Sequence, residues 1–233
     1  MLLYLGSTGV VTDSQLLLFE KGELLTGPAS TFDDRVSSGV RRSVDENLVG
    51  VLRRARAAAF RRDAPSLADA RVWHREMVAA LRVPHPSHVG HFRGEVGLET
   101  YRARVGVNKG LAPDDVVGAV AKFEQTLQSA VAALDGRYPS GQELDADGLA
   151  AVIDLCAWAR AEWIRIHPFA NGNGRTARIW ANVLLVRYGL PPAMRLRPRP
   201  DDGYGEAGAA AMTGDWKPTA AIIRRMLAGT FTS

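Results

Sequence analysis

Residues 167–178 of the sequence, HPFANGNGRTAR, combine an imidazole, a glycine-rich turn and two guanidinium groups. Gly172 and Gly174 allow successive backbone N–H groups to converge on one point, and the start of a helix there adds its positive dipole. Both features favour the binding of an anion such as phosphate. The segment is therefore predicted to contain a phosphate cradle that begins beside a histidine.

Two arginines and one histidine supply the side chains of this predicted site. Arg175 and Arg178 are three residues apart and share one face of a helix, so they can clamp phosphate oxygens together. His167 is the natural general base, because no other side chain near the cradle titrates close to pH 7. Phe169 is expected to anchor the loop in the core. Each feature alone is more often structural, but their combination favours a functional site.

Composition is typical of a soluble globular protein, with 46% hydrophobic and 23% charged residues among 233. No apolar run approaches the roughly 20 residues that cross a bilayer, and the first residues lack the basic region of a signal peptide. A cytoplasmic protein without membrane association is expected. The single cysteine, Cys156, excludes an internal disulfide and is expected in the core.

The formal net charge is +4. The densest basic run consists of Arg53, Arg54, Arg56, Arg61 and Arg62. Such a run on a helix is usually a solvated face, and it lacks the interleaved aromatic residues of a nucleic-acid binder. We therefore do not expect nucleic acid as a partner, whereas a basic balance suits an anionic substrate.

Helical periodicity dominates the elements that would position the segment. Helices are predicted over residues 44–62, from Ser66 onward, over 113–136, from about 145 to 167, over 175–188 and over 218–227. Ser66 and Asp69 resemble a capping box, and Pro113 suits a first helical position. The helix over 175–188 is apolar on several sides, which predicts a central, mostly buried helix.

Strand signals are confined to two regions. Residues 84–112 are rich in Gly and Pro and are predicted to form a loop with a small hairpin, in which 100–107 alternates enough for a strand. Residues 1–30 fit either short strands or an amphipathic arm. The chain is thus expected to divide into an N-terminal arm and helix, 1–62, with a regulatory role open, and a mostly helical domain, 63–233.

The segment HPFANGNGRTAR resembles the signature of Fic-domain proteins: His-x-Phe, two residues, Gly-Asn-Gly-Arg, two residues, Arg. The resemblance extends over roughly residues 66–230. Residues 90–93 look like the Gly-x-Phe-Arg element of the family, 94–110 fall where its flap hairpin lies, and 213–218 look like its C-terminal segment. The resemblance implies a mostly α Fic fold, a helical bundle around a central motif helix with a small β-hairpin flap.

The resemblance also implies an activity, AMP transfer from ATP to a Ser, Thr or Tyr hydroxyl of an unidentified target protein, with release of pyrophosphate. By position, His167 would deprotonate the hydroxyl and Arg178 would hold the distal phosphates, with Arg175 completing the catalytic set. Strand addition to the flap would align the target, and Tyr204 would lie near the base. The implied nucleotide-binding residues are Phe169, Asn171, Gly172, Asn173, Gly174, Arg175, Arg178 and Tyr204.

Asn171 departs from the family pattern, because most active members have Asp or Glu there as a ligand of the Mg²⁺ on the nucleotide phosphates. An amide oxygen still ligates Mg²⁺, but hard cations favour carboxylates. Asn171 is the candidate metal ligand, with a weakened affinity for Mg²⁺ expected. Alternatively, it simply tolerates the backbone angles of the turn.

Regulation is open at this point. Many family members carry an inhibitory helix with Ser or Thr, three residues, Glu, and then Gly or Asn. Glu46 and Asn47 fit the end of that pattern, but Arg42 occupies the Ser/Thr position, and residues from Ser43 to Glu46 are equally a capping box. Inhibition through Glu46, an antitoxin-like partner, an oligomeric regulator and no regulator are the alternatives.

Other activities also stay open. Phosphotransferase relatives have a Lys in the cradle, and Gly174 in this chain favours AMP transfer instead. Transfer of UMP or of a phosphate-containing group such as phosphocholine is one alternative. A catalytically weak nucleotide-binding module is the other, and Asn171 motivates it.

Overall fold

The computed structural model describes residues 38–79, 81, 83–105, 107–196 and 203–231, so the interpretation of residues 1–30 lies outside the described residues. Its elements are α2 (Ser38–Arg61), α3 (Leu67–Met77), the 3-10 helix η1 (Pro86–His88), β1 (Arg104–Val105), β2 (Asn108–Lys109), α4 (Pro113–Arg137), α5 (Ala146–Ile166), α6 (Asn173–Arg187), α7 (Tyr204–Met212) and α8 (Lys217–Phe231).

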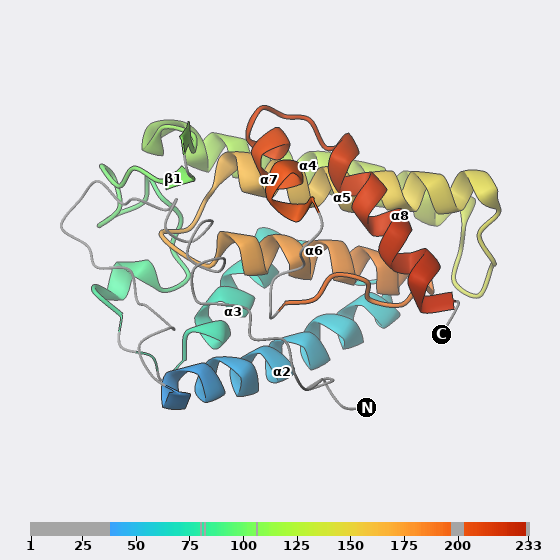
Figure 1. Cartoon of the computed structure of the whole chain (residues 1–233), viewed down its shortest axis with the longest axis horizontal. Helices are drawn as coiled ribbons and strands as arrows, with labels where there is room; N and C mark the ends of the chain where they lie inside the picture. Colours follow the sequence, from blue (N-terminus) through green and yellow to red (C-terminus); the bar gives the residue numbers. More distant parts are fainter. Residues whose placement is uncertain (1–37, 80, 82, 106, 197–202, 232–233) are drawn as a thin grey trace.

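Helix α6 is the central element, with α2 on one side of it and α5 on the other (Figure 1). Helix α5 also packs against α4, α7 and α8. Trp163 of α5 is fully buried, and its ring centroid lies 5.3–6.1 Å from those of Phe92, Phe123, Phe169 and Trp180. The mostly helical fold and the buried central helix are therefore confirmed.

Several helix ends lie where the sequence predicts them. Ser66 and Asp69 form the capping box of α3, and Pro113 is the first residue of α4. Asp145 caps α5, because its Oδ1 accepts the N–H of Gly148 at 2.7 Å. These caps satisfy donors that the first turn of a helix leaves without an intrahelical partner.

One interpretation of the sequence is wrong, and one helix was not predicted. Helix α2 begins at Ser38, so Ser43 lies inside it and residues from Ser43 to Glu46 are not its capping box. Val44 and Leu48, which follow Ser43 in the helix, are buried in the core. Helix α7 was not predicted, since Gly205 and Gly208 mask the helical signal of its alanines.

The hairpin is shorter than the predicted strand over residues 100–107. Strands β1 and β2 are antiparallel, and the register pairs Arg104 with Lys109 and Val105 with Asn108. The glycine-rich sequence on either side limits the ladder to these two pairs, which agrees with a small flap.

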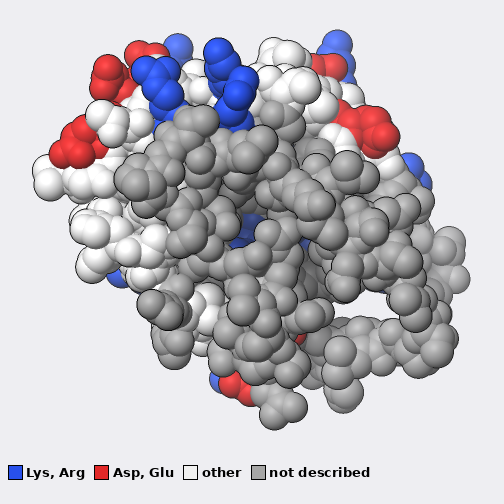
Figure 2. All heavy atoms as spheres, turned by 60° about the vertical axis from the view of Figure 1, so that its left-hand side comes forward, with Lys and Arg blue, Asp and Glu red and all other residues white. Residues whose placement is uncertain are grey.

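Four arginines of the basic run lie exposed on α2, as predicted: Arg53, Arg54, Arg56 and Arg61. Arg62 differs, because it follows the helix, is partly buried and donates from Nη1 to the carbonyl of Tyr138 at 2.7 Å. Arg54 pairs with Glu76, and Arg61 pairs with Asp63. Along the upper edge of the face in Figure 2, Lys and Arg side chains likewise stand beside Asp and Glu side chains. No helix in the part of the chain that the structure describes is long and apolar enough to span a bilayer.

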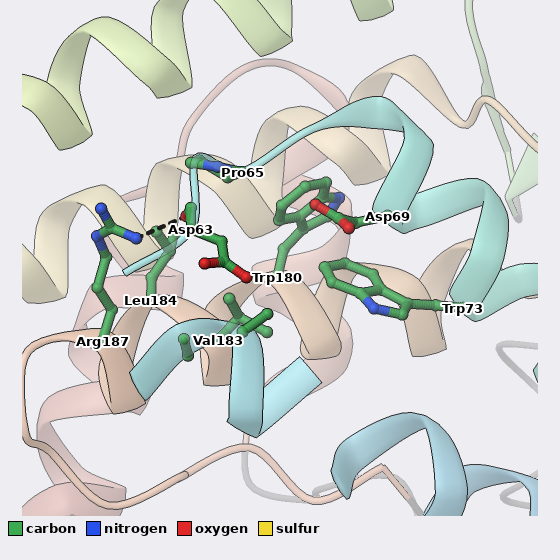
Figure 3. A pocket seen from close by; sticks show the side chains of 10 residues that line it. Asp63, Pro65, Asp69, Trp73, Trp180, Val183, Leu184 and Arg187 are labelled. Atoms are coloured by element: carbon green, nitrogen blue, oxygen red, sulfur yellow. Dashed lines mark hydrogen bonds between the residues drawn. The ribbon is translucent and has the colours of Figure 1, made fainter. Parts of the chain in front are cut away.

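A small cavity lies between α2, α3 and α6 (Figure 3). Trp73 and Trp180 form one wall, and Arg187 closes the other end, where its Nη1 donates to the carbonyl oxygen of Asp63 at 2.8 Å. The volume of the cavity is about 20 Å³, which is room for a single water molecule. This cavity is therefore too small for a nucleotide.

Gly148 in the first turn of α5 gives a test of this packing. A Cβ there would lie 2.5 Å from the buried ring of Tyr138, whose hydroxyl donates to Asp145 Oδ1 at 2.6 Å. Gly148→Ala should therefore lower the free energy of unfolding by about 1–3 kcal/mol. Chemical denaturation measures the change.

Gly118 in α4 is the matched control, because a Cβ there would meet nothing within 4 Å. Gly118→Ala should raise the free energy of unfolding by about 0.5–1 kcal/mol through helix propensity alone. Equal stabilisation by the two substitutions would contradict the contact between Gly148 and Tyr138.

Candidate active site

His167 follows the last residue of α5 and adopts a left-handed backbone conformation, with φ 54° and ψ 57°. The residue is almost completely buried, with a relative exposure of 2%. Nδ1 lies 3.2 Å from the carbonyl oxygen of Ile164, which can only accept, so we assign the proton to Nδ1. Nε2 is then the acceptor nitrogen, as a general base requires.

The fully buried Arg93 fixes this end of α5. Its guanidinium donates to four backbone carbonyls: Nε to His167 at 2.7 Å, Nη2 to Ile166 at 2.9 Å, and Nη1 to Leu111 at 2.9 Å and Tyr101 at 3.3 Å. The carbonyls of Ile166 and His167 lie at the end of α5, and those of Tyr101 and Leu111 lie on either side of the hairpin. One side chain therefore sets the position of the hairpin relative to His167. The sequence placed Arg93 in a family element but gave it no role.

The loop between α5 and α6 is closed by Asn173. Its Oδ1 accepts the N–H of Phe169 at 2.8 Å, and its Nδ2 donates to the carbonyl of Phe169 at 2.8 Å. Phe169 is fully buried among the core aromatic rings, as predicted. The side-chain amide of Asn173 thus shapes the loop, and its predicted contact with phosphate would have to come from its backbone.

His74 of α3 supports the same loop from outside, a role that the sequence did not indicate. Its Nδ1 accepts the N–H of Gly90 at 3.1 Å, and its Nε2 lies 3.0 Å from the carbonyl oxygen of Asn171, to which it donates. The ring stacks on Phe169 with 4.0 Å between centroids. Burial lowers the pKa of His74 to about 3, so the imidazole is neutral.

The start of α6 has the glycine-rich backbone on which the predicted cradle depends. Gly172 precedes the helix with φ +79°, and a Cβ there would lie 3.0 Å from Met77, so glycine fits both the angle and the space. Gly174 lies beside Arg178, whose Nη1 would be 3.6 Å from a Cβ at that glycine. Arg175 is half-buried in the same turn. The structure therefore brings Gly172, Gly174 and Arg178 together at a positive helix end.

Arg178 is held from two sides. Its Nη2 donates to the carbonyl of Leu196 at 2.9 Å, and its Nη1 donates to the hydroxyl of Tyr204 at 3.3 Å. The same hydroxyl accepts from Arg160 Nε at 3.0 Å. Sequence reasoning placed Tyr204 near the base by resemblance, whereas the described contacts of its hydroxyl are with these two arginines. Arg160 was missed.

The pKa of Tyr204 reflects this position. Burial alone raises it, but the positive charges of Arg160 and Arg178 and their hydrogen bonds outweigh burial. The net result is a pKa lowered from 10.0 to about 8. Two positive charges, those of Arg160 and Arg178, therefore act on the hydroxyl of Tyr204.

Asn171 is the candidate metal ligand. Its Oδ1 accepts a hydrogen bond from the N–H of Gly172. The described residues contain no group of three or more His, Cys, Asp or Glu that could hold a metal ion. Asn171 can therefore contribute a single neutral oxygen at this turn.

Glu46 does not reach Arg178 through any described contact, and it is exposed on α2. The neighbouring Asn47 instead donates from Nδ2 to the carbonyls of Met77 at 3.3 Å and Ala79 at 2.8 Å. Asn47 thereby ties α2 to the end of α3, and inhibition through Glu46 stays a hypothesis drawn from sequence.

These features define a helical domain in which a histidine at the end of one helix stands directly before the glycine-rich start of the next helix. The Fic/DOC family model matches residues 65–185, and the chain belongs to this family. Its resemblance to Fic-domain proteins is thus confirmed.

Two curated relatives are both named protein adenylyltransferase Fic. The one from Nematostella vectensis is 39% identical over 74 residues, or 31% of this chain and 17% of the relative. The one from Drosophila willistoni is 31% identical over 112 residues, or 47% of this chain and 20% of the relative. The matched stretches therefore span a fifth or less of these relatives.

Solved structures share the fold. A Fic-domain-containing signalling protein from Bacteroides thetaiotaomicron has a TM-score of 0.54 at 16% identity, covering 82% of this chain and 72% of that one. Fic-1 from C. elegans has a TM-score of 0.55 at 22% identity, covering 83% of this chain and 50% of that one.

His74 predicts a pH dependence of folding. Its pKa is lowered from 6.5 to about 3 in the folded protein, so below pH 6.5 the unfolded chain binds a proton that the folded protein does not. The contribution of His74 to stability is complete above pH 6.5 and falls, by on the order of 1 kcal/mol per pH unit, as the pH drops toward 3.

Denaturation with urea at several pH values measures this slope. His74→Gln removes the titration and retains a donor for the carbonyl of Asn171, so its stability should fall less steeply with acid than that of the wild type. Parallel pH profiles for the two proteins would show that His74 is not buried as a neutral ring.

Proposed function

We propose that this chain transfers AMP from ATP to a Ser, Thr or Tyr hydroxyl of a protein and releases pyrophosphate. The observation that carries the proposal is the arrangement of the loop between α5 and α6. His167, with its acceptor nitrogen, lies at the end of α5, and the start of α6 lies beside Arg178. Curated relatives named protein adenylyltransferase Fic support it. ATP and a target protein are the proposed partners.

In this proposal, His167 Nε2 takes the proton of the target hydroxyl. The hydroxyl oxygen forms a bond to the α-phosphorus, and the bond from that phosphorus to the bridging oxygen breaks, so pyrophosphate leaves with its electron pair. The N–H groups at the start of α6 and the guanidinium groups of Arg175 and Arg178 stabilise the developing charge. Phe169 and Asn173 keep the loop in shape.

Arg93 and the hairpin would place the target. The edge of the β1–β2 hairpin offers backbone groups to an extended segment of the target protein, which is recognition by strand addition. Because Arg93 joins the carbonyls around this hairpin to that of His167, a segment bound there would be held at a fixed position relative to the base.

Mg²⁺ fits this site only in a limited way. The amide oxygen of Asn171 would be its one protein ligand, and the phosphates and water would supply the rest. The ion would neutralise phosphate charge when bound.

A second candidate function is a nucleotide-binding domain without transferase activity, which the neutral Asn171 favours. Incubation of the full chain with a lysate and ATP labelled at the α-phosphate distinguishes the two. We expect protein-bound label that His167→Ala abolishes while ATP binding persists. ATP labelled only at the γ-phosphate should give the same protein-bound label with the wild type as with His167→Ala, and additional label with the wild type would indicate phosphate transfer instead.

The limited metal site gives a further prediction. Asn171→Asp places a carboxylate on the same turn, where its charge favours Mg²⁺. The concentration of Mg²⁺ needed for half-maximal labelling should fall about tenfold, since one added charge contact contributes on the order of 1 kcal/mol. An unchanged Mg²⁺ dependence would show that residue 171 is not a metal ligand.

A further inference from the structure

We propose that Arg160, through the hydroxyl of Tyr204, positions the guanidinium of Arg178 for the distal phosphates of the nucleotide. Arg160, Tyr204 and Thr219 are here called the arginine support. Arg160 is thus a positioning residue that lies outside the sequence motif, in a site that the proposed function requires. The inference rests on that proposed function and adds two helices, α7 and α8, to those that build the site.

The arginine support links α5, α7 and α8. Arg160 Nη1 donates to Thr219 Oγ1 at 2.8 Å, and its Nε donates to the hydroxyl of Tyr204 at 3.0 Å. The guanidinium carbon of Arg160 also lies 4.3 Å from the centre of the Tyr204 ring. All three residues are buried, so the assembly is rigidly packed rather than a surface contact.

Arg178 meets the arginine support through one nitrogen. Its Nη1 donates to the hydroxyl of Tyr204 at 3.3 Å, and its Nη2 donates to the carbonyl of Leu196 at 2.9 Å. The segment before Leu196 is itself fixed, because Asn182 bonds both the N–H and the carbonyl of Met194. The guanidinium is therefore held by two hydrogen bonds, one on each terminal nitrogen, and it cannot rotate without breaking one of these bonds.

The arrangement of positive charges around the hydroxyl of Tyr204 is unusual. Two buried guanidinium groups share one phenol oxygen, and the other described acceptors of both are the neutral oxygens of Thr219 and Leu196. Buried cations without a carboxylate are costly unless another anion compensates. In addition, Arg178 Nε is buried and has no hydrogen-bond partner among the described residues.

Both observations fit an anionic ligand beside Arg178, where Gly174 leaves space next to the guanidinium. Arg160 would contribute to such a site in two ways. It holds the hydroxyl that orients Arg178, and it adds a second positive charge behind it. Its guanidinium is turned to Tyr204 and Thr219, so it acts through Arg178 rather than on the substrate.

The test compares nucleotide binding by the full chain, measured by calorimetry without turnover. Tyr204→Phe keeps the ring and removes the hydroxyl, and Arg160→Met removes the charge behind it. We expect the affinity for ATP to fall about tenfold in Tyr204→Phe, the equivalent of one hydrogen bond to a charged group. The affinity for AMP, which has no distal phosphates, should stay within about twofold of the wild type.

Tyr188→Phe is the matched control. The hydroxyl of Tyr188 is also buried and bonds a backbone carbonyl, that of Val131 at 3.4 Å, but it lies at the other end of α6. Its removal should leave the affinities for both nucleotides unchanged. A general loosening of the core would instead weaken binding in both tyrosine variants.

Ultraviolet absorbance gives a second readout that needs neither nucleotide nor activity. The wild type should contain one tyrosine that ionises near pH 8, because the two arginines lower the pKa of Tyr204 to about 8. That transition should disappear in Tyr204→Phe and move to higher pH in Arg160→Met. Tyr204→Phe retains the packed ring, so the test stands even where Arg160→Met does not fold.

Equal losses of ATP and AMP affinity, or unchanged ATP affinity in folded Tyr204→Phe, would overturn the positioning role. If the wild type transfers no label but shows the expected ATP and AMP pattern, the proposed function fails while the support of Arg178 stands. The two claims are therefore separable.

Discussion

The hydrogen bonds of Arg93 are the constraint on which the rest of the site depends. The last carbonyls of a helix lack intrahelical partners, and at the end of α5 two of them, those of Ile166 and His167, accept from this one buried guanidinium. The same group holds carbonyls on either side of the hairpin, and the backbone N–H of Arg93 donates to Pro168 at 2.7 Å. These bonds stabilise the left-handed conformation of His167, which a non-glycine residue rarely adopts.

From that fixed point, the chain turns directly into the start of α6. The turn is short because Asn173 closes it against Phe169, and Phe169 is held by the aromatic core. The end of one helix and the start of the next therefore lie together, with the imidazole of His167 at the first and backbone N–H donors at the second. Arg178 extends the donors by one turn, and its orientation depends on residues of α7 and of the loop before it.

Much of this was predictable because it is local in sequence. The bounds of α4 and α5 follow from apolar periodicity and caps, and His167, Gly172, Gly174 and Arg178 lie within one short segment. The supporting residues were not predictable. His74 and Arg93 bond backbone carbonyls and N–H groups far along the chain, and Arg160 bonds side chains on two other helices, so none of them has a partner that a sequence pattern would reveal. The error at Ser43 has the opposite origin, since a locally plausible cap lies inside a longer helix.

The orientation of the nucleotide tests the central claim most directly. A crystal structure of the full chain with Mg²⁺ and a non-hydrolysable ATP analogue would place each phosphate relative to the loop. The account predicts the distal phosphates at the start of α6 within hydrogen-bonding distance of Arg178, and the α-phosphorus facing the side of His167 Nε2. A nucleotide bound elsewhere, or one reversed so that its γ-phosphate faces His167, would contradict it.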